Sequence, residues 1–406
     1  MLAHGVIIQR PSEGEPTLLG YSPKQLQQMK TQIGLGALSI PSALDTLGLI
    51  PGLICMLAIA VITTWSDYMI GVFKLNHRQV HSIANAGGLM FGRFGRLWLT
   101  GCLPDWIFVA GSGMLGISIG LSAVSTHGAC TAMFVAVAAV IGFVFGSIRT
   151  LGKLGFPAWI GLSCVLTAIF TVTIAVGIQD RSSEASHTPG PWASDYELVG
   201  KPSFTEAITA MRDPRYYTRS LMICQSGVTA IHITIGTVVY YYCGSYVASP
   251  ALGSAGLTVK KVAYGFALPG LTATTMLVIH LPAKILSIRL LLHSSRHLTS
   301  NTPTHWITWL SCTFGITIIA YIIASAIPVF NGLVSLVGAL LGTLMSFQPM
   351  GGKSDGRARW VLMVSWCVFD FVFGMFCMVS CTYGSVVGVV DSYRETGGIG
   401  GMELCG

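Results

Sequence analysis

The chain has 406 residues, of which 52% are hydrophobic and only 10% are charged, and its mean hydropathy is +0.68. Soluble domains carry about a quarter charged residues, so this composition argues against a soluble globular protein and for a chain that lies largely in lipid. The formal net charge of +7 comes from Lys and Arg residues spread over several polar segments, which argues against a nucleic-acid-binding protein.

The first thirty residues form a polar segment. They include Arg10, Glu13, Glu15, Lys24 and Lys30 and contain no apolar run like the core of a cleaved signal peptide. We therefore expect residues 1–29 to be an N-terminal tail and the first membrane segment to anchor the chain.

The first apolar segment, residues 30–41, has the sequence KTQIGLGALSIP. Its two glycines and its proline weaken an α-helix, because glycine adds backbone entropy and proline removes a hydrogen bond. Backbone groups freed in lipid need other partners, and many secondary transporters use such a break to hold a substrate carboxylate and a cation. The alternative is that the glycines only let two helices pack closely. The residues predicted to bind a substrate are Gly34, Leu35, Gly36, Ala37 and Ser39.

A series of apolar runs follows this segment, and most of them reach the ~20 residues that cross the hydrocarbon of a bilayer. The runs comprise residues 49–73, 97–124, 130–145, 156–178, 221–242, 262–292, 306–327, 329–347 and 360–390. They predict an all-α polytopic membrane protein whose transmembrane domain, residues 30–395, holds about ten helical segments. Residues 396–406 form a C-terminal tail.

Basic residues orient the predicted helices, because Lys and Arg collect in cytoplasmic loops. Lys74, Arg78, Arg93 and Arg96 place the loop after the run 49–73 on the cytoplasmic side. Counting backwards from that loop puts the N-terminus in the cytoplasm. Counting forwards puts Arg149 and Lys153 inside and residues 180–184 outside.

The second half of the chain gives a conflicting count. Lys284 and Lys353 lie in two basic loops that are two helices apart, and extrapolation from them puts Arg212 and Arg219 inside. The segment 180–219 would then begin outside and end inside, yet its only apolar piece, near 204–211, is too short to span. The sequence therefore predicts that one crossing is missing near 204–211.

Acidic residues within a span are candidates for functional sites. Asp45 follows the predicted break and can cap the next helix, and Asp67 lies near the cytoplasmic end of its run, where water solvates it. Asp105 is compatible with an interfacial position or with a role in ion coupling. Asp370 lies deep in the last run, where helix packing or an oligomer contact explains it better than a proton relay.

Other polar and aromatic residues give no sign of catalysis. His232 and His280 lie singly in apolar runs and are interpreted as hydrogen-bonded core residues, and Trp306 and Trp309 resemble an interfacial aromatic belt. The sequence has no HExxH, no GxSxG on a strand-to-helix turn and no paired intramembrane carboxylates. Its eleven cysteines form no CxxC pair and no Cys/His metal spacing. We expect neither an enzyme nor a bound metal.

Five separated blocks stand out along the chain: KTQIGLGALSIPSALDTLGLIPG at 30–52, MRDPRYYTRS at 211–220, VAYGFALPGLTATT at 262–275, FNGLVSLVGALLGTLMSFQPM at 330–350 and TYGSVVGVVDSYR at 382–394. In this order they resemble the amino acid/auxin permease family in its fungal neutral amino acid branch. The resemblance covers most of the chain from about residue 30 to 395.

This resemblance implies a LeuT-type fold of eleven helices, of which the first ten form two inverted five-helix repeats. It implies secondary active transport of a neutral amino acid by alternating access, coupled to Na+ or H+ and without another cofactor, in the plasma or vacuolar membrane. The substrate would lie between the broken first and sixth helices. The residues implied in cation coupling are Ile33, Thr272, Thr274 and Thr275; hydrogen bonding of these threonines to their own helix is the alternative.

The chain departs from the family pattern where the sixth helix should be. A family segment like SNLVFAYAGHxAFF should precede the MRDPRYY block, but FTEAITA, residues 204–210, runs directly into it. Residues 21–29 are polar where the family has an apolar half-helix, and residues 351–355 replace a longer loop. The expected fold is therefore LeuT-type but incomplete. The chain is either a working carrier or a transport-incompetent truncated isoform or gene-model product that acts at most as a membrane scaffold.

Overall fold

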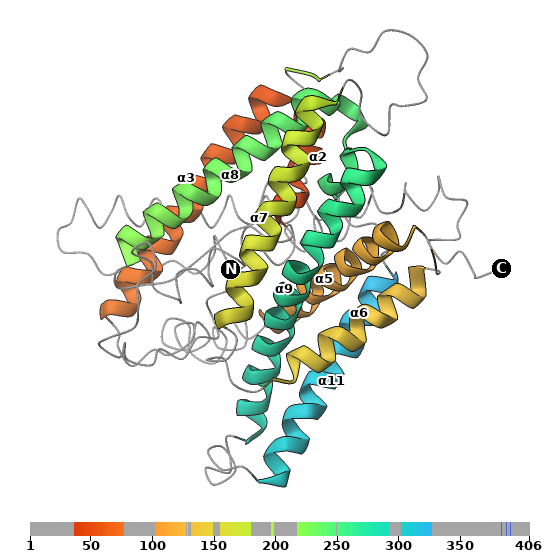
Figure 1. Cartoon of the computed structure of the whole chain (residues 1–406). Coiled ribbons are helices and arrows are strands. Elements are labelled where there is room, and N and C mark those ends of the chain that lie inside the picture. Colours follow the sequence, from red (N-terminus) through yellow and green to blue (C-terminus); the bar gives the residue numbers. More distant parts are fainter. Residues whose placement is uncertain are drawn as a thin grey trace.

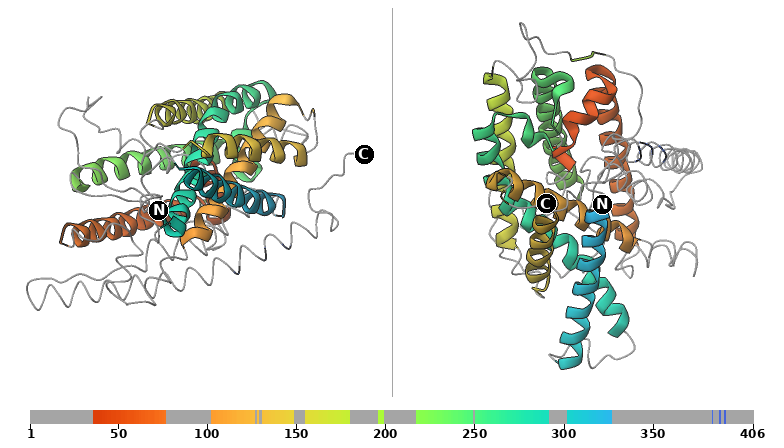
Figure 2. Two further views of the ribbon diagram at one scale, coloured as in Figure 1. Left: turned by 90° about the horizontal axis from the view of Figure 1, so that it is seen from below. Right: turned by 90° about the vertical axis from the view of Figure 1, so that its right-hand side faces the viewer.

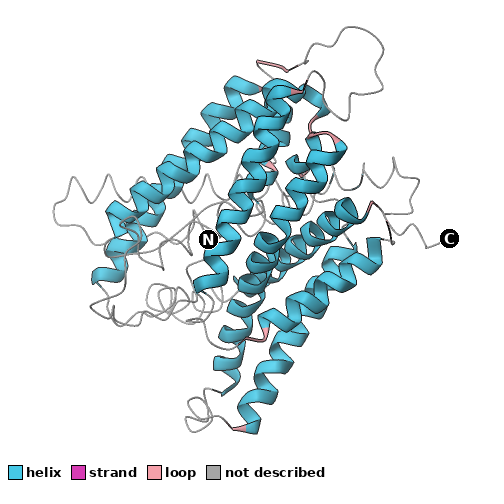
Figure 3. Ribbon diagram, viewed as in Figure 1, coloured by secondary structure: helices cyan, strands magenta, loops and turns pink. Residues whose placement is uncertain are grey.

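The computed structural model describes residues 36–76, 102–126, 128, 131–148, 155–179, 196–198, 217–248, 250–291 and 302–326, and the single residues 383, 387 and 390. All regular elements in this part of the chain are helices (Figure 3). In chain order they are η1 (Gly36–Leu38), α2 (Ile40–Leu47), α3 (Leu49–Asn76), α5 (Cys102–Ser125), α6 (Thr131–Gly146), α7 (Gly155–Ile178), α8 (Tyr217–Cys243), η3 (Gly244–Tyr246), η4 (Ala251–Ser254), α9 (Leu257–Leu291) and α11 (Pro303–Ala326).

Four of these helices are long and apolar enough to cross a membrane within the described residues, in α5, α7, α9 and α11. Leu49–Trp65 in α3 and Thr131–Gly146 in α6 are shorter apolar helices. The predicted all-α, polytopic membrane architecture is therefore confirmed. Apart from single residues of the last run, the predicted runs at 329–347 and 360–390 lie outside the described residues.

Stripes of large apolar side chains face outwards along several helices. On α3 the stripe repeats every three to four residues, which is one face of an α-helix. Soluble proteins rarely expose apolar patches of this length, whereas lipid tails solvate them. The exposed side chains are Ile50, Ile54, Leu57 and Val61 on α3, Met133, Val137, Val140 and Val144 on α6, and Ile307, Phe314, Ile318 and Ile322 on α11.

Helix α9 is the centre of the bundle. It contacts α5, α6, α7 and α11 (Figure 1), and its inward residues Tyr264, Leu271 and Val278 belong to the main apolar core. It stays helical through Pro269 and Pro282, because neighbouring helices in a membrane bundle satisfy the backbone groups that proline frees. A second group joins α2, α3 and α8, and α3 lies beside α8 along its length (Figures 1 and 2).

Consecutive helices α7 and α8 run in the same direction. Gly177 near the end of α7 lies against the ring of Tyr242 near the end of α8, with 3.5 Å between a Cβ position at Gly177 and Tyr242 Cε2. Residues 196–198 are still on this side of the bundle, because Glu197 N–H donates to Tyr240 Oη at 2.9 Å. Tyr217, the first residue of α8, begins a helix of 27 residues and thus lies roughly 40 Å away on the other side.

The chain therefore passes from one side of the bundle to the other between Leu198 and Tyr217. The sequence between them carries Lys201, Glu206 and Arg212, and helical transmembrane segments seldom hold so many charges. Two neighbouring membrane helices with the same direction are expected to be separated by one crossing in the opposite direction. The parallel course of α7 and α8 agrees with the positions of the basic residues, which predict that one crossing is missing between these two helices.

Replacing Gly270 by alanine is expected to destabilise the bundle. A Cβ atom there would lie 2.7 Å from the carbonyl oxygen of Gly161 and would also meet Val165, so α7 and α9 would have to separate. Overpacking of this kind costs about 1–3 kcal/mol. The measurement is the thermal unfolding midpoint of the protein purified in detergent.

Gly265→Ala is the matched control on the same helix. No heavy atom of the described residues lies within 4 Å of its Cβ position, and alanine favours a helix over glycine by about 1 kcal/mol. Its midpoint should equal or exceed that of the natural chain. Equal midpoints for the two variants would show that α7 and α9 do not need glycine to approach.

Candidate functional site

The first membrane segment is interrupted twice in the described residues. A single 3-10 turn, η1, precedes Ser39, and the eight-residue helix α2 follows with Pro41 in its first turn. Gly48 then turns the chain into α3 with φ 81° and ψ 163°, a conformation that is essentially restricted to glycine. Of the predicted substrate residues, Gly36, Ala37 and Ser39 lie at this interruption. Gly34 and Leu35, like the predicted coupling residue Ile33, lie outside the described residues.

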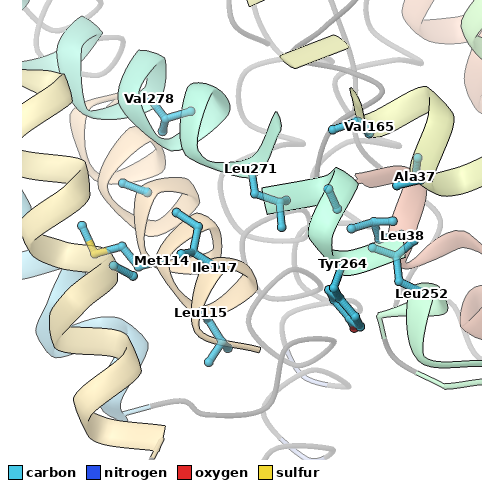
Figure 4. Packing of buried hydrophobic residues seen from close by; sticks show 14 of the residues in the cluster. Ala37, Leu38, Met114, Leu115, Ile117, Val165, Leu252, Tyr264, Leu271 and Val278 are labelled. Atoms are coloured by element: carbon cyan, nitrogen blue, oxygen red, sulfur yellow. The ribbon is translucent and has the colours of Figure 1, made fainter. Parts of the chain in front are cut away.

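The interruption is enclosed by protein. Ala37 and Leu38 are 1% and 3% exposed and belong to the same buried cluster as Leu252 of η4 and Tyr264 of α9 (Figure 4). Helix α2 packs against α8, where a Cβ atom on Gly236 would lie 2.8 Å from Ile40 Cγ2. A helix break that only accommodated lipid would not need partners from the second half of the chain.

Ser39 places a polar group in this enclosed region. Its backbone is in the right-handed helical region, and its hydroxyl makes no capping hydrogen bond to α2. Ser39 Oγ is buried without a hydrogen-bond partner among the described residues, while Ser42 Oγ donates to the Ser39 carbonyl at 2.9 Å. The side chain at the interruption is thus available to a ligand or to water.

The predicted coupling threonines all lie on α9. Thr274 and Thr275 are buried, and their hydroxyls donate to the carbonyls of Gly270 and Leu271 at 2.9 Å, which is the back-bonded alternative. Thr275 faces Gly113 of α5. It lies roughly 16 Å along the helix from Tyr264, the α9 residue clustered with Ala37. The described residues therefore do not bring Thr275 to the interruption, and Thr272, which is half-buried, makes no hydrogen bond that assigns it a role.

Of the acidic candidates, only Asp45 has a side chain among the described residues. Asp45 lies within α2 and is half-buried, but the first amides of α3 donate to other groups. Leu49 N–H and Ile50 N–H donate to the carbonyls of Glu197 and Leu198 at 2.8 and 2.9 Å, so the predicted cap does not hold these amides. The side chains of Asp67 and Asp105, and all of Asp370, lie outside the described residues.

The prediction for one of the two tryptophans is wrong. Trp309 is 2% exposed, and its Nε1–H donates to the carbonyl of Ser147 at 2.9 Å, just beyond the end of α6. Only Trp306, at 42% exposed, is placed as an interfacial aromatic residue would be. Trp309 shares one face of α11 with the buried residues Thr313, Ile316 and Ala320, and this helical spacing was the sequence signal that Trp309 is buried.

The interpretation of the two histidines as core residues holds for His280, which is 0% exposed. Its ring lies edge-on to Trp309 with 5.1 Å between ring centroids and faces the backbone carbonyls of Gly146 and Ile148 at the end of α6. His232 on α8 differs, because its Nε2 is buried without a hydrogen-bond partner in the described part of the chain. Hydropathy could not reveal this, because the partners of a buried imidazole depend on tertiary packing.

Comparisons with known proteins place the chain among transporters. Residues 26–388 match the family model described as transmembrane amino acid transporter protein. A "Transmembrane transporter" of Fusarium pseudograminearum is 31% identical over 410 aligned positions, covering 93% of this chain and 85% of the relative. A protein of the same description from Gibberella moniliformis is 30% identical with the same coverage. The "N amino acid transport system protein" of Neurospora crassa is 28% identical, covering 92% of this chain and 86% of the relative.

Proposed function

Because the chain belongs to the transmembrane amino acid transporter family, we propose that it is a secondary active transporter of neutral amino acids. It would work by alternating access and would be driven by a proton or sodium gradient. The fold proposed is the LeuT type without its sixth helix, with a cytoplasmic N-terminus, in the plasma or vacuolar membrane. The Neurospora relative, described as an amino acid transport protein, supports the substrate class.

The interruption between Gly36 and Gly48 is the observation that carries this proposal. A transporter needs backbone groups that are free to bind a zwitterion at a place reached from both sides of the membrane. Ala37 and Ser39 lie at such a break, between α8, α9 and η4 rather than against lipid. We assign substrate binding to Gly34, Leu35, Gly36, Ala37 and Ser39.

The cation would bind near Ile33, Thr272, Thr274 and Thr275. A threonine hydroxyl that donates to its own helix keeps an acceptor lone pair, so the back-bonded Thr274 and Thr275 remain compatible with a cation ligand. Of these threonines, Thr275 faces Gly113 of α5 rather than the interruption.

A second candidate is a chain that is inserted in the membrane but does not transport. The parallel course of α7 and α8 favours it, because a lost crossing would remove the partner of the first broken helix. The alignment with the Fusarium relative spans 410 positions, whereas only 93% of the 406 residues of this chain are aligned, so the relative has residues without a counterpart here.

Uptake of radiolabelled amino acids by a permease-deficient yeast expressing the chain tests the proposal. We expect uptake of L-leucine and L-phenylalanine above the empty vector, little uptake of L-glutamate or L-lysine, and loss of uptake when the proton or the sodium gradient is removed. A tagged chain that reaches the plasma membrane at normal abundance without uptake of any amino acid would favour the second candidate.

A further inference from the structure

We propose that His232 of α8 is a substrate-contacting residue that, together with Ser39, binds the carboxylate of the transported amino acid. This inference rests on the proposed function and extends it to a residue outside the first segment. The two groups share one property. Ser39 Oγ and His232 Nε2 are both buried without a hydrogen-bond partner among the described residues. Leaving such a group unpaired costs about 1–3 kcal/mol, so buried polar atoms are normally paired with protein, water or a ligand.

The contacts of α8 place His232 beside the beginning of α2. Gly236, one turn after His232 on the same helix face, lies against Ile40 and Leu44, with Cβ distances of 2.8 and 2.9 Å to their side chains. Its lack of a side chain lets α2 approach α8 closely at this level. The buried face of α8 continues through Val228 and Val239, so His232 lies near the middle of that face.

The relative direction of α2 and α8 shows which end of α2 lies nearest to His232. Leu49, just after α2, donates to Glu197, and Glu197 N–H donates to Tyr240 Oη, which lies one turn after Gly236. The end of α2 is therefore level with Tyr240, and α2 and α8 are parallel. His232, one turn before Gly236, is consequently level with Ser39 at the start of α2.

The chemistry of the two groups favours an anionic partner. A serine hydroxyl and a neutral imidazole can each donate one hydrogen bond, and a carboxylate accepts from both. The start of α2 adds the positive end of the helix dipole, which favours an anion over a cation. The described residues of η1 and of the first turn of α2 carry no charged side chain that would compete for the ligand. The carboxylate of an amino acid meets these requirements.

Ligand binding to the purified chain tests the assignment without depending on transport. The readout is the thermal unfolding midpoint as a function of L-leucine, and L-leucinamide, which lacks the carboxylate, is the comparison. We expect L-leucine but not L-leucinamide to stabilise the natural chain. His232→Leu should bind L-leucine at least about tenfold more weakly, and His232→Gln, which keeps a donor, should stay within about threefold of the natural chain.

His280→Leu is the matched control, since it removes another buried histidine from a place beside Trp309. It should bind L-leucine as the natural chain does. Equal weakening by His232→Leu and His280→Leu, or equal stabilisation by L-leucinamide, would overturn the inference. A natural chain that L-leucine does not stabilise would overturn the proposed function and the ligand assigned here together.

A designed metal bridge tests the position of His232 independently of any substrate. Ser39→His should form a Zn2+ pair with the native His232, so Zn2+ should raise the unfolding midpoint of this variant by several degrees more than that of the natural chain. The rise should vanish in the double variant Ser39→His, His232→Leu. No effect of Zn2+ on Ser39→His would show that the two side chains are apart and would overturn the inference, even if the chain transports leucine.

Discussion

Inserting an apolar helix of about 20 residues between Ala210 and Met211 is expected to raise amino acid uptake at least tenfold. The described helices α7 and α8 run in the same direction, and Glu197 lies on the side where both of them end. An added crossing would give the chain a membrane path between these two points that the charged residues around Glu206 do not provide. Uptake should rise because it scales with the fraction of chains in a transport-competent arrangement. The measurement is the initial rate of L-leucine uptake in permease-deficient yeast, divided by the amount of protein at the membrane.

A polar insert of the same length, made of Gly and Ser, is the control. It lengthens the connection between α7 and α8 but cannot span hydrocarbon, so its uptake should equal that of the natural chain. Equal uptake by the natural chain and the helix-inserted chain, above that of the empty vector, would mean that residues 199–216 already provide a working passage. In that case the transport-incompetent alternative would lose its main support.

Gly48→Ala is expected to destabilise the connection between α2 and α3. An alanine held at φ 81° and ψ 163° would carry about 1–3 kcal/mol of backbone strain, whatever space surrounds its Cβ atom. The same residue closes α2, because its N–H donates to the Leu44 carbonyl at 2.8 Å, and its carbonyl accepts from Gly52 N–H at 3.0 Å. The strain therefore acts on the connection that sets the angle between α2 and α3. We expect a lower unfolding midpoint and a lower yield of folded protein.

Gly315→Ala in α11 is the control for this substitution. No heavy atom of the described residues lies within 4 Å of its Cβ position, and alanine is favoured in a helix interior. Its unfolding midpoint should match or exceed that of the natural chain. If Gly48→Ala were as stable as Gly315→Ala, the turn between α2 and α3 would not require glycine.

Hydropathy predicts the helices of this chain well because lipid imposes one rule on every segment. The run 156–178 becomes α7, Gly155–Ile178, and the run 306–327 becomes α11, Pro303–Ala326. Even the long run 262–292 becomes one helix, α9, despite two internal prolines. Length and apolar character decide these elements, and neither depends on which neighbours the helix finds.

The site is only partly predictable from the sequence. Glycine and proline predict an interruption in the first segment, since their effect on the backbone is local. The conflict between the basic residues of the two halves predicts the parallel course of α7 and α8. The packing of Trp309 against His280, and the approach of α8 to α2 at Gly236, depend on side chains far apart in sequence. No local pattern carries that information.

The backbone contacts of Glu197 and Leu198 couple two parts of the bundle mechanically. These residues hold the first amides of α3, and Glu197 is itself held by Tyr240 of α8. In an alternating-access cycle, α2 could not tilt without carrying α3 and α8 with it on this side of the membrane. The moving body would therefore be the trio α2, α3 and α8, rocking as a unit against the stationary frame built around α9 from α5, α6 and α11.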